Sequence, residues 1–144
     1  MIVVDDLPSR PPPARSILDP LSLRWEDRAR TRQRVVTRSG REVGIKLPTG
    51  TRLSPGTVVV LGDGWHVAVE AAEEDVWVVR ARDRRSLLRA AWEIGNRHFP
   101  VELDEDEIAV LYDHTLEELW RRLNVEAVRT HRPFLAEMRP HRHD

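Results

Sequence analysis

The chain contains no cysteine, so disulfide bonds, thiolate metal sites and cysteine nucleophiles are all excluded. No apolar run approaches the roughly 20 residues that a membrane-spanning helix needs. Residues 1–16 also lack the basic-then-apolar order of a signal peptide. A chain without cysteine is compatible with a reducing compartment. These absences lead us to expect a cytoplasmic protein that does not bind membranes.

The sequence also lacks the motifs that mark the common enzyme classes. It has no G-x-S-x-G nucleophile turn, no P-loop, no H-E-x-x-H metalloprotease motif and no G-x-G-x-x-G dinucleotide motif. Serines are few, and none of them lies in a nucleophile-type turn. We therefore expect a protein that is not an enzyme.

Charge is nearly balanced over the whole chain but not within its halves. The formal net charge is −1, which gives no global attraction to nucleic acid or acidic membranes. Residues 1–72 hold eleven basic and eight acidic side chains (+3), whereas residues 73–144 hold twelve and sixteen (−4). This asymmetry indicates two units with different surfaces.

The first half of the chain has the pattern of a small β domain. Residues 5–20 carry five of the ten prolines, so we expect a loosely ordered segment over residues 1–20. Alternating runs around Ser39-Gly40 predict one hairpin, and the runs on either side of "GDG" at 62–64 predict a second. Residues 21–73 are therefore expected to form a small all-β domain of the barrel or sandwich kind.

The second half alternates strands and helices. A strand at 76–81 is followed by a helix over 84–94, capped by Asp83, with Leu87, Leu88, Ala91 and Ile94 on one face. Gly95 stands where a left-handed C-terminal residue is expected. Strands near 100–103 and 108–112, a helix from Asp113 to Asn124 and a last strand at 125–130 complete the pattern.

This order, βαββαβ, is that of a ferredoxin-like domain, which we place at residues 74–134. Residues 135–144 are expected to form a flexible tail. The predicted fold class is α+β, with the small all-β domain followed by the ferredoxin-like domain.

Histidines are the main candidates for chemistry, because neutral imidazole is a good ligand for nickel, copper and zinc. His141 and His143 form a His-x-His pair, which in an extended tail places both rings on one side. The alternative is a terminal sequence that is merely solvated.

His98, in "GNRHFP", follows a helix stop and comes two residues before Pro100, which restricts Phe99 to extended geometry. Its backbone should be fixed while its side chain faces outward. One imidazole cannot hold a metal, but a two-fold dimer would supply two copies from one self-complementary patch. The alternative is a solvated loop histidine.

Three further histidines rank lower. His114 follows Asp113 at a helix start, where neutral imidazole is favoured, so it is a secondary candidate ligand. His66, next to Trp65 in a hairpin, is expected to be structural, and His131 is uninformative by itself.

Two charged stretches are the remaining candidates for a functional site. Arg28, Arg30, Arg32 and Arg34 recur at period two and would share one face of a strand. This face is either a patch for phosphate or an acidic partner, or the solvated face of an exposed sheet, which we prefer. The run "DEDE" at 104–107 lacks the spacing and glycine of a calcium loop and is expected to be a solvated turn.

Five blocks in order, "LRWEDRARTRQR", "GIKLPTGTRL", "AAEEDVWVV", "GNRHFPVEL" and "VLYDHTLEEL", resemble the UreE family of urease accessory nickel metallochaperones. The resemblance covers about Ser22 to Phe134, and "GNRH-x-P" is its most specific part. It implies a β domain likened to a peptide-binding module, a ferredoxin-like metal-binding domain, and a homodimer with Ni²⁺ at its two-fold interface.

Within that resemblance His98 matches the interfacial histidine, and His141 and His143 match a variable histidine-bearing tail. Some members carry H-D-H where this chain has Tyr112-Asp113-His114, so only half of that pair is present. The implied partners are a urease accessory GTPase and the urease apoprotein complex.

The expected function is therefore delivery of Ni²⁺ to the urease maturation complex by a cytoplasmic homodimer, with Zn²⁺ and Cu²⁺ binding to the same ligands in vitro. The alternative is a small RNA- or ribosome-associated maturation factor that uses the basic β domain; it requires salt-dependent RNA binding and indifference to nickel. A histidine-zinc hydrolase is a third option without a supporting motif.

Overall fold

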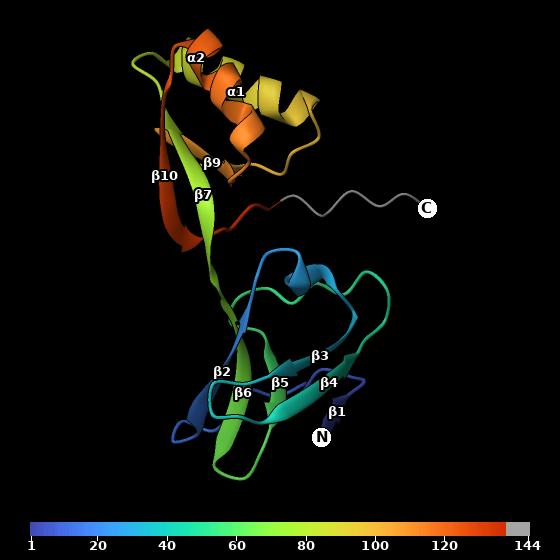
Figure 1. The fold of residues 1–144 in the computed structure, drawn as a ribbon. Helices are drawn as coiled ribbons and strands as arrows, with labels where there is room; N and C mark the ends of the chain where they lie inside the picture. Colours follow the sequence, from blue (N-terminus) through green and yellow to red (C-terminus); the bar gives the residue numbers. More distant parts are fainter. Residues whose placement is uncertain (138–144) are drawn as a thin grey trace. The chain divides into compact units, whose positions relative to one another are not determined.

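A computed structural model describes residues 1–137, which divide into two compact units, Met1–Ala72 and a second that begins at Glu73 (Figure 1). The first is built of strands, and the second combines a sheet with two α-helices. This α+β architecture confirms the fold class expected from the sequence. Among the described residues, no helix combines the length and the apolar character needed to cross a membrane.

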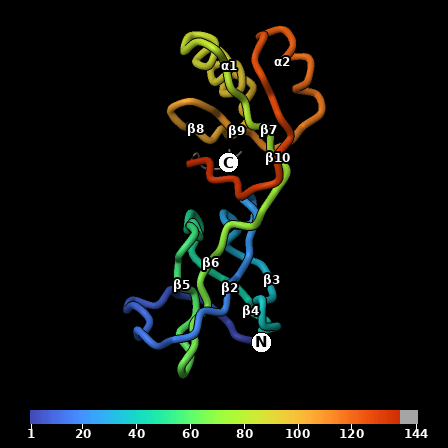
Figure 2. Tube along the Cα trace, turned by 90° about the vertical axis from the view of Figure 1, so that its left-hand side faces the viewer, coloured from blue at the N-terminus to red at the C-terminus, as the bar shows by residue number. Residues whose placement is uncertain are grey.

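Two three-stranded sheets form the first unit (Figure 2). Their orders are β1-β4-β3 and β2-β6-β5, with β1 parallel to β4, β2 parallel to β6, and the other pairs antiparallel. The strands are β1 (Ile2–Val4), β2 (Ile17–Leu23), β3 (Arg32–Val36), β4 (Glu42–Lys46), β5 (Val58–Leu61) and β6 (Trp65–Ala71). Alternate residues from both sheets form one buried apolar cluster that includes Leu21, Val43 and Val67.

Both expected hairpins are present, but the N-terminal segment differs from its expectation. Gly40, with φ +97°, turns β3 into β4, and residues 62–64 join β5 to β6. Residues 1–20, expected to be loosely ordered, instead contain β1 and the start of β2. Their parallel partner strands lie tens of residues away, so no local sequence pattern predicts β1 or β2.

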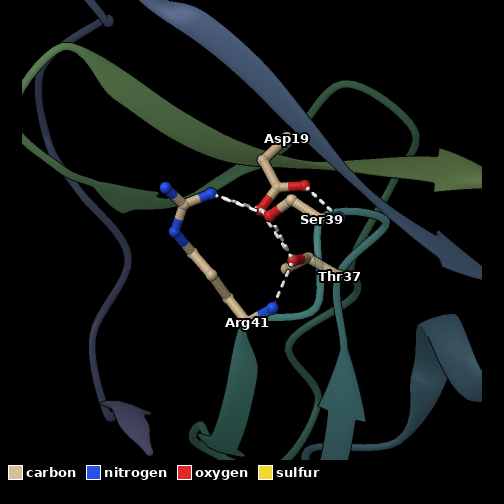
Figure 3. Close-up of polar contacts among 4 residues, drawn as sticks. All are labelled: Asp19, Thr37, Ser39 and Arg41. Carbon is tan, nitrogen blue, oxygen red and sulfur yellow. Dashed lines mark hydrogen bonds and ion pairs between the residues drawn. The ribbon is translucent and has the colours of Figure 1, made fainter.

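A buried carboxylate connects the two sheets of this unit. Asp19 on β2 is 4% exposed and accepts hydrogen bonds from Thr37 Oγ1 and Ser39 Oγ, both at 2.6 Å, from Ser39 N at 3.0 Å and from Arg41 at 2.7 Å (Figure 3). The donors all come from the β3–β4 turn. The Arg41 guanidinium also lies 3.8 Å from the centre of the Trp65 ring on β6.

These bonds decide the charge of Asp19. Burial alone raises the pKa of Asp19, but the hydrogen bonds from Ser39, Thr37 and Arg41 together hold that pKa far below its usual range. The carboxylate is therefore ionised and fully paired, as a buried charge must be. We interpret the cluster as a structural link that fixes the turn against β2.

The expected arginine face is wrong for two of its members. Arg28 is 1% exposed, lies in the 3-10 helix η1 (Asp27–Ala29) and donates to the carbonyl oxygen of Leu23 at 3.1 Å. Arg30 follows η1 as its cap and is exposed. Only Arg32 and Arg34 share an exposed strand face, on β3, because η1 occupies residues 27–29 and the strand begins only at Arg32.

The second unit has one four-stranded antiparallel sheet of order β10-β7-β9-β8. Its elements are β7 (Glu73–Arg80), α1 (Arg84–Asn96), β8 (Glu102–Leu103), β9 (Glu107–Leu111), the 3-10 helix η2 (His114–Leu116), α2 (Glu117–Leu123) and β10 (Glu126–Pro133). This is the split βαβ topology of a ferredoxin-like domain.

Both helices pack on the same face of this sheet. The buried cluster joins Trp77, Val79, Ile108 and Val110 of the strands to helix residues that include Ile94. Register explains the choice of face, because Trp77 pairs with Val110 and Val79 pairs with Ile108. One sheet face therefore decides which side of α1 is buried and which side remains exposed.

Candidate metal centre

The candidate site lies at the end of α1, a helix that is anchored along its length. At its start Asp83 accepts a hydrogen bond from Ser86 N at 2.8 Å, which caps the helix as expected. Along its inner face Leu87, Ala90 and Ile94 are buried against the sheet. The position of its last turn is therefore determined by the core.

The helix ends in a Schellman motif centred on His98. His98 has φ +65°, its amide donates to the carbonyl oxygen of Gly95 at 3.0 Å, and the Phe99 amide donates to that of Ile94 at 3.2 Å. Phe99 packs against the core cluster that contains Ile94, which is the hydrophobic contact typical of this motif.

The expectation that Gly95 takes the left-handed position is wrong. Gly95 lies within α1, which continues to Asn96, and it is absent from the glycines of positive φ in the described chain. The left-handed residue is His98, three positions later. The core contact of Phe99 decides the stop, because it requires the chain to turn immediately before residue 99.

A histidine at this position is unusual, because left-handed geometry brings the Cβ of an L-residue close to its own carbonyl and costs about 1–2 kcal/mol. Glycine is the ordinary residue here. The fold thus holds His98 in a strained conformation and exposes its side chain. Strain of this kind is found at functional sites, where the surrounding structure over-determines the residue.

Three ion-paired side chains, those of Arg89, Glu93 and Arg97, lie along the last turns of α1 before His98. Glu93 is 9% exposed, and its carboxylate accepts from Arg97 at 2.5 Å and from Arg89 at 3.3 Å. Arg97 also donates to the Glu93 carbonyl oxygen at 3.0 Å, so its guanidinium folds back along the helix. The hydrogen bond from Arg97 is the main reason that the pKa of Glu93 lies below its ordinary value.

The outer face of α1 is apolar next to this site. Leu88 and Trp92 are 61% and 60% exposed and lie one turn apart. The expectation that Leu88 shares the buried face is therefore wrong; Ala90 takes that place. Sequence reasoning also missed Trp92, although its spacing of four from Leu88 could have revealed a second apolar stripe.

His114 is the first residue of η2 and is exposed. Asp113 accepts hydrogen bonds from Thr115 Oγ1 at 2.6 Å and Thr115 N at 2.9 Å, which lower the pKa of Asp113 and make it the cap of that turn. Tyr112 directly precedes Asp113, and the Arg129 guanidinium lies over its ring, 3.8 Å from the ring centre.

The structure does not place two of the other expected ligands. His141 and His143 lie outside the described residues, and within residues 1–137 no group of three or more histidine, aspartate or glutamate side chains is arranged to hold a metal ion. His66 Nδ1 lies 2.7 Å from Ser16 Oγ, in line with a structural role. His131 lies 3.0 Å from Asp75 and 3.7 Å from Glu73, as a surface ion-pair partner.

Comparison with known proteins identifies relatives over both units. Residues 4–72 match the family model of the UreE urease accessory protein N-terminal domain, and residues 74–143 match that of the C-terminal domain. Proteins named urease accessory protein UreE are similar over 138 residues in Cupriavidus pinatubonensis (38% identity) and Cupriavidus necator (39%). Each alignment covers 93% of this chain, but only 62% and 72% of the relative's length.

Proposed function

The chain belongs to the UreE family of urease accessory proteins, and from that premise we propose that it carries Ni²⁺ to the urease maturation machinery. The ion is held at the two-fold interface of a homodimer by His98 from each subunit. The family is one of accessory proteins rather than enzymes, in agreement with the expectation from the sequence. The observation that carries the proposal is the strained, exposed His98 at the end of α1.

Dimer formation is needed because a single fixed imidazole cannot satisfy the four to six ligands of Ni²⁺. A two-fold axis beside His98 supplies a second imidazole from the same residue. The exposed Leu88 and Trp92 on the preceding turns provide apolar area for such a self-complementary contact.

Gly95 is a second argument for a subunit contact on this side of α1. It follows Trp92 by three residues and Leu88 by seven, so it lies on their side of α1. A Cβ built on Gly95 meets no atom within 4 Å, so the packing of this chain does not require glycine there. Glycine inside a helix costs about 0.5–1 kcal/mol relative to alanine. Close approach of a second chain explains why that cost is tolerated.

The remaining ligands come from other parts of the chain. We assign His141 and His143 as tail ligands that complete the coordination shell, and His114 as a secondary ligand. An imidazole and water shell without thiolates holds Ni²⁺ yet exchanges it, because its ligands can leave one at a time. The same shell accepts Cu²⁺ and Zn²⁺ in vitro.

The proposed partners are a urease accessory GTPase and the urease apoprotein complex, in the cytoplasm. Arg32 and Arg34 on β3 form an exposed basic pair that suits an acidic partner surface. The RNA-associated alternative is not favoured, because both units match a urease accessory family.

Titration with Ni²⁺ followed by native mass spectrometry tests the proposal. We expect one tightly bound ion per wild-type dimer and its loss in His98→Ala. His114→Ala should retain that ion and lose only weaker binding. Tight binding of one ion by the His98→Ala dimer would refute the proposal.

A further inference from the structure

We propose that Glu93 is a positioning residue for the metal site, which keeps the Arg97 charge paired and folded back so that a divalent cation can bind at His98. This inference rests on the proposed function, since it concerns the same site. It assigns a role to a buried carboxylate that packing alone does not require.

The first step is the location of Arg97. Arg97 directly precedes His98 in sequence, and its backbone amide donates to the carbonyl oxygens of Glu93 at 3.2 Å and Ile94 at 3.1 Å. An arginine beside the ligand would repel a dication if its side chain extended toward it. The repulsion matters because adjacent Cα atoms are only about 3.8 Å apart.

The second step is how that charge is held. Two bonds from Arg97 Nη1, to the Glu93 carboxylate and to the Glu93 carbonyl oxygen, direct the guanidinium toward the preceding turn of α1. There Arg97 lines a cavity with Phe99, Thr115 and Glu118, on the side of α1 that faces η2 and α2.

The third step is the cost of burying Glu93. A carboxylate that is 9% exposed in the middle of a helix face must be compensated, and here Arg89 and Arg97 both compensate it. The triad of Arg89, Glu93 and Arg97 carries one net positive charge. Without the carboxylate it would carry two, with one of them unpaired beside His98.

The experiment measures Ni²⁺ affinity by competition with a chromophoric chelator, on the full chain, in wild type, Glu93→Gln and Glu93→Gln/Arg97→Gln. At about 0.1 M salt we expect Glu93→Gln to bind Ni²⁺ about 3–10-fold more weakly, because like charges near the site are only partly screened. The double variant should return to within about 2-fold of wild type. Near 1 M salt, where the screening length is about 3 Å, the defect of the single variant should shrink.

Control measurements distinguish an effect of charge on Ni²⁺ affinity from an effect of lost stability. Glu126→Gln removes an exposed carboxylate beside the start of α1, at the opposite end of that helix from His98, and should leave affinity unchanged. Thermal unfolding of each variant reports any loss of stability, which a purely structural role would produce without salt dependence or rescue.

Two results would overturn the inference: wild-type affinity in Glu93→Gln, or a defect that persists in the double variant and at high salt. If either result is found while His98→Ala still binds Ni²⁺ more weakly than wild type, only the role of Glu93 is refuted. Unimpaired His98→Ala refutes the proposed function instead.

Discussion

The amide of His98 donates a 3.0 Å hydrogen bond to the carbonyl oxygen of Gly95, and this bond closes α1 with a histidine in the left-handed conformation. The two residues have exchanged their usual places. Glycine, which adopts positive φ without steric cost, lies inside the helix, and histidine, which adopts it only at a cost, ends it. Each choice opposes local stability, and both are explained if the outer end of α1 binds a metal between two subunits.

Replacing His98 should therefore separate stability from metal binding. We expect His98→Gly to be more stable than His98→Ala by about 1 kcal/mol, because glycine relieves the left-handed strain that alanine retains. Both variants should lose tight Ni²⁺ binding. Urea unfolding of the metal-free proteins and Ni²⁺ titration measure the two effects.

Asn124 supplies the matched control, because it is the other described non-glycine residue at positive φ (+53°) and also ends a helix. Asparagine tolerates this conformation better than most residues. Asn124→Gly should thus change stability by less than about 0.5 kcal/mol and leave Ni²⁺ binding intact. Equal stability of His98→Gly and His98→Ala would contradict the role of strain.

Trp92→Arg should prevent dimer formation without unfolding the chain. Trp92 is 60% exposed, so its loss leaves no cavity in the core, whereas two arginines facing each other across a two-fold axis repel. Analytical ultracentrifugation should detect monomers, and native mass spectrometry should detect no tight Ni²⁺. Leu103→Arg, at a residue 68% exposed on β8, is the control that should remain dimeric. A dimeric Trp92→Arg would place the interface elsewhere.

A chain that ends at Glu137 tests the two tail histidines. Removing residues 138–144 deletes His141 and His143 and keeps all the helices and strands found within residues 1–137. We expect the truncated protein to form dimers and to bind Ni²⁺ more weakly, by about 10-fold or more, because in the proposed site two copies of His98 supply only part of the coordination shell. Isothermal titration measures the change. Unaltered affinity would show that the tail contributes no ligand.

Asp19→Asn should destabilise the first unit in a pH-dependent manner. At pH 7 we expect a loss of about 2 kcal/mol or more, because Arg41 and the hydroxyl donors lose a charged acceptor. The pKa of Asp19 is lowered on folding, so its stabilisation is full above about pH 4 and declines as the pH falls toward the folded pKa. Denaturation curves should thus show a smaller difference in stability between wild type and variant at pH 3 than at pH 7. Nickel affinity should not change.

Reversing the charge of Arg32 and Arg34 tests the proposed partner surface. Both are exposed on β3, at an edge of their sheet, so the double change to glutamate should leave the first unit folded. We expect weaker pull-down of the accessory GTPase and unchanged Ni²⁺ titration. Undiminished pull-down would remove this surface from consideration.

Much of the fold could be predicted because the relevant signals are local. Period-two runs around Ser39-Gly40 predicted a hairpin that is present, and Asp83 and Asn124 were correctly assigned as helix ends. Strands β1 and β2 escaped prediction, because each pairs in parallel with a distant strand and proline dominates the segment between them.

The sequence by itself determined the ligand chemistry: without cysteine, imidazole nitrogen is the donor suited to Ni²⁺ that this chain offers in number. It also determined the order of strands and helices in the second unit, because periodicity reports which residues can share a face. Only the tertiary structure decided that Phe99 docks in the core and drives His98 into the left-handed conformation. Only the packing within each unit decided that Leu88 and Trp92 remain exposed while Arg28 is buried, since burial depends on contacts between distant parts of the chain.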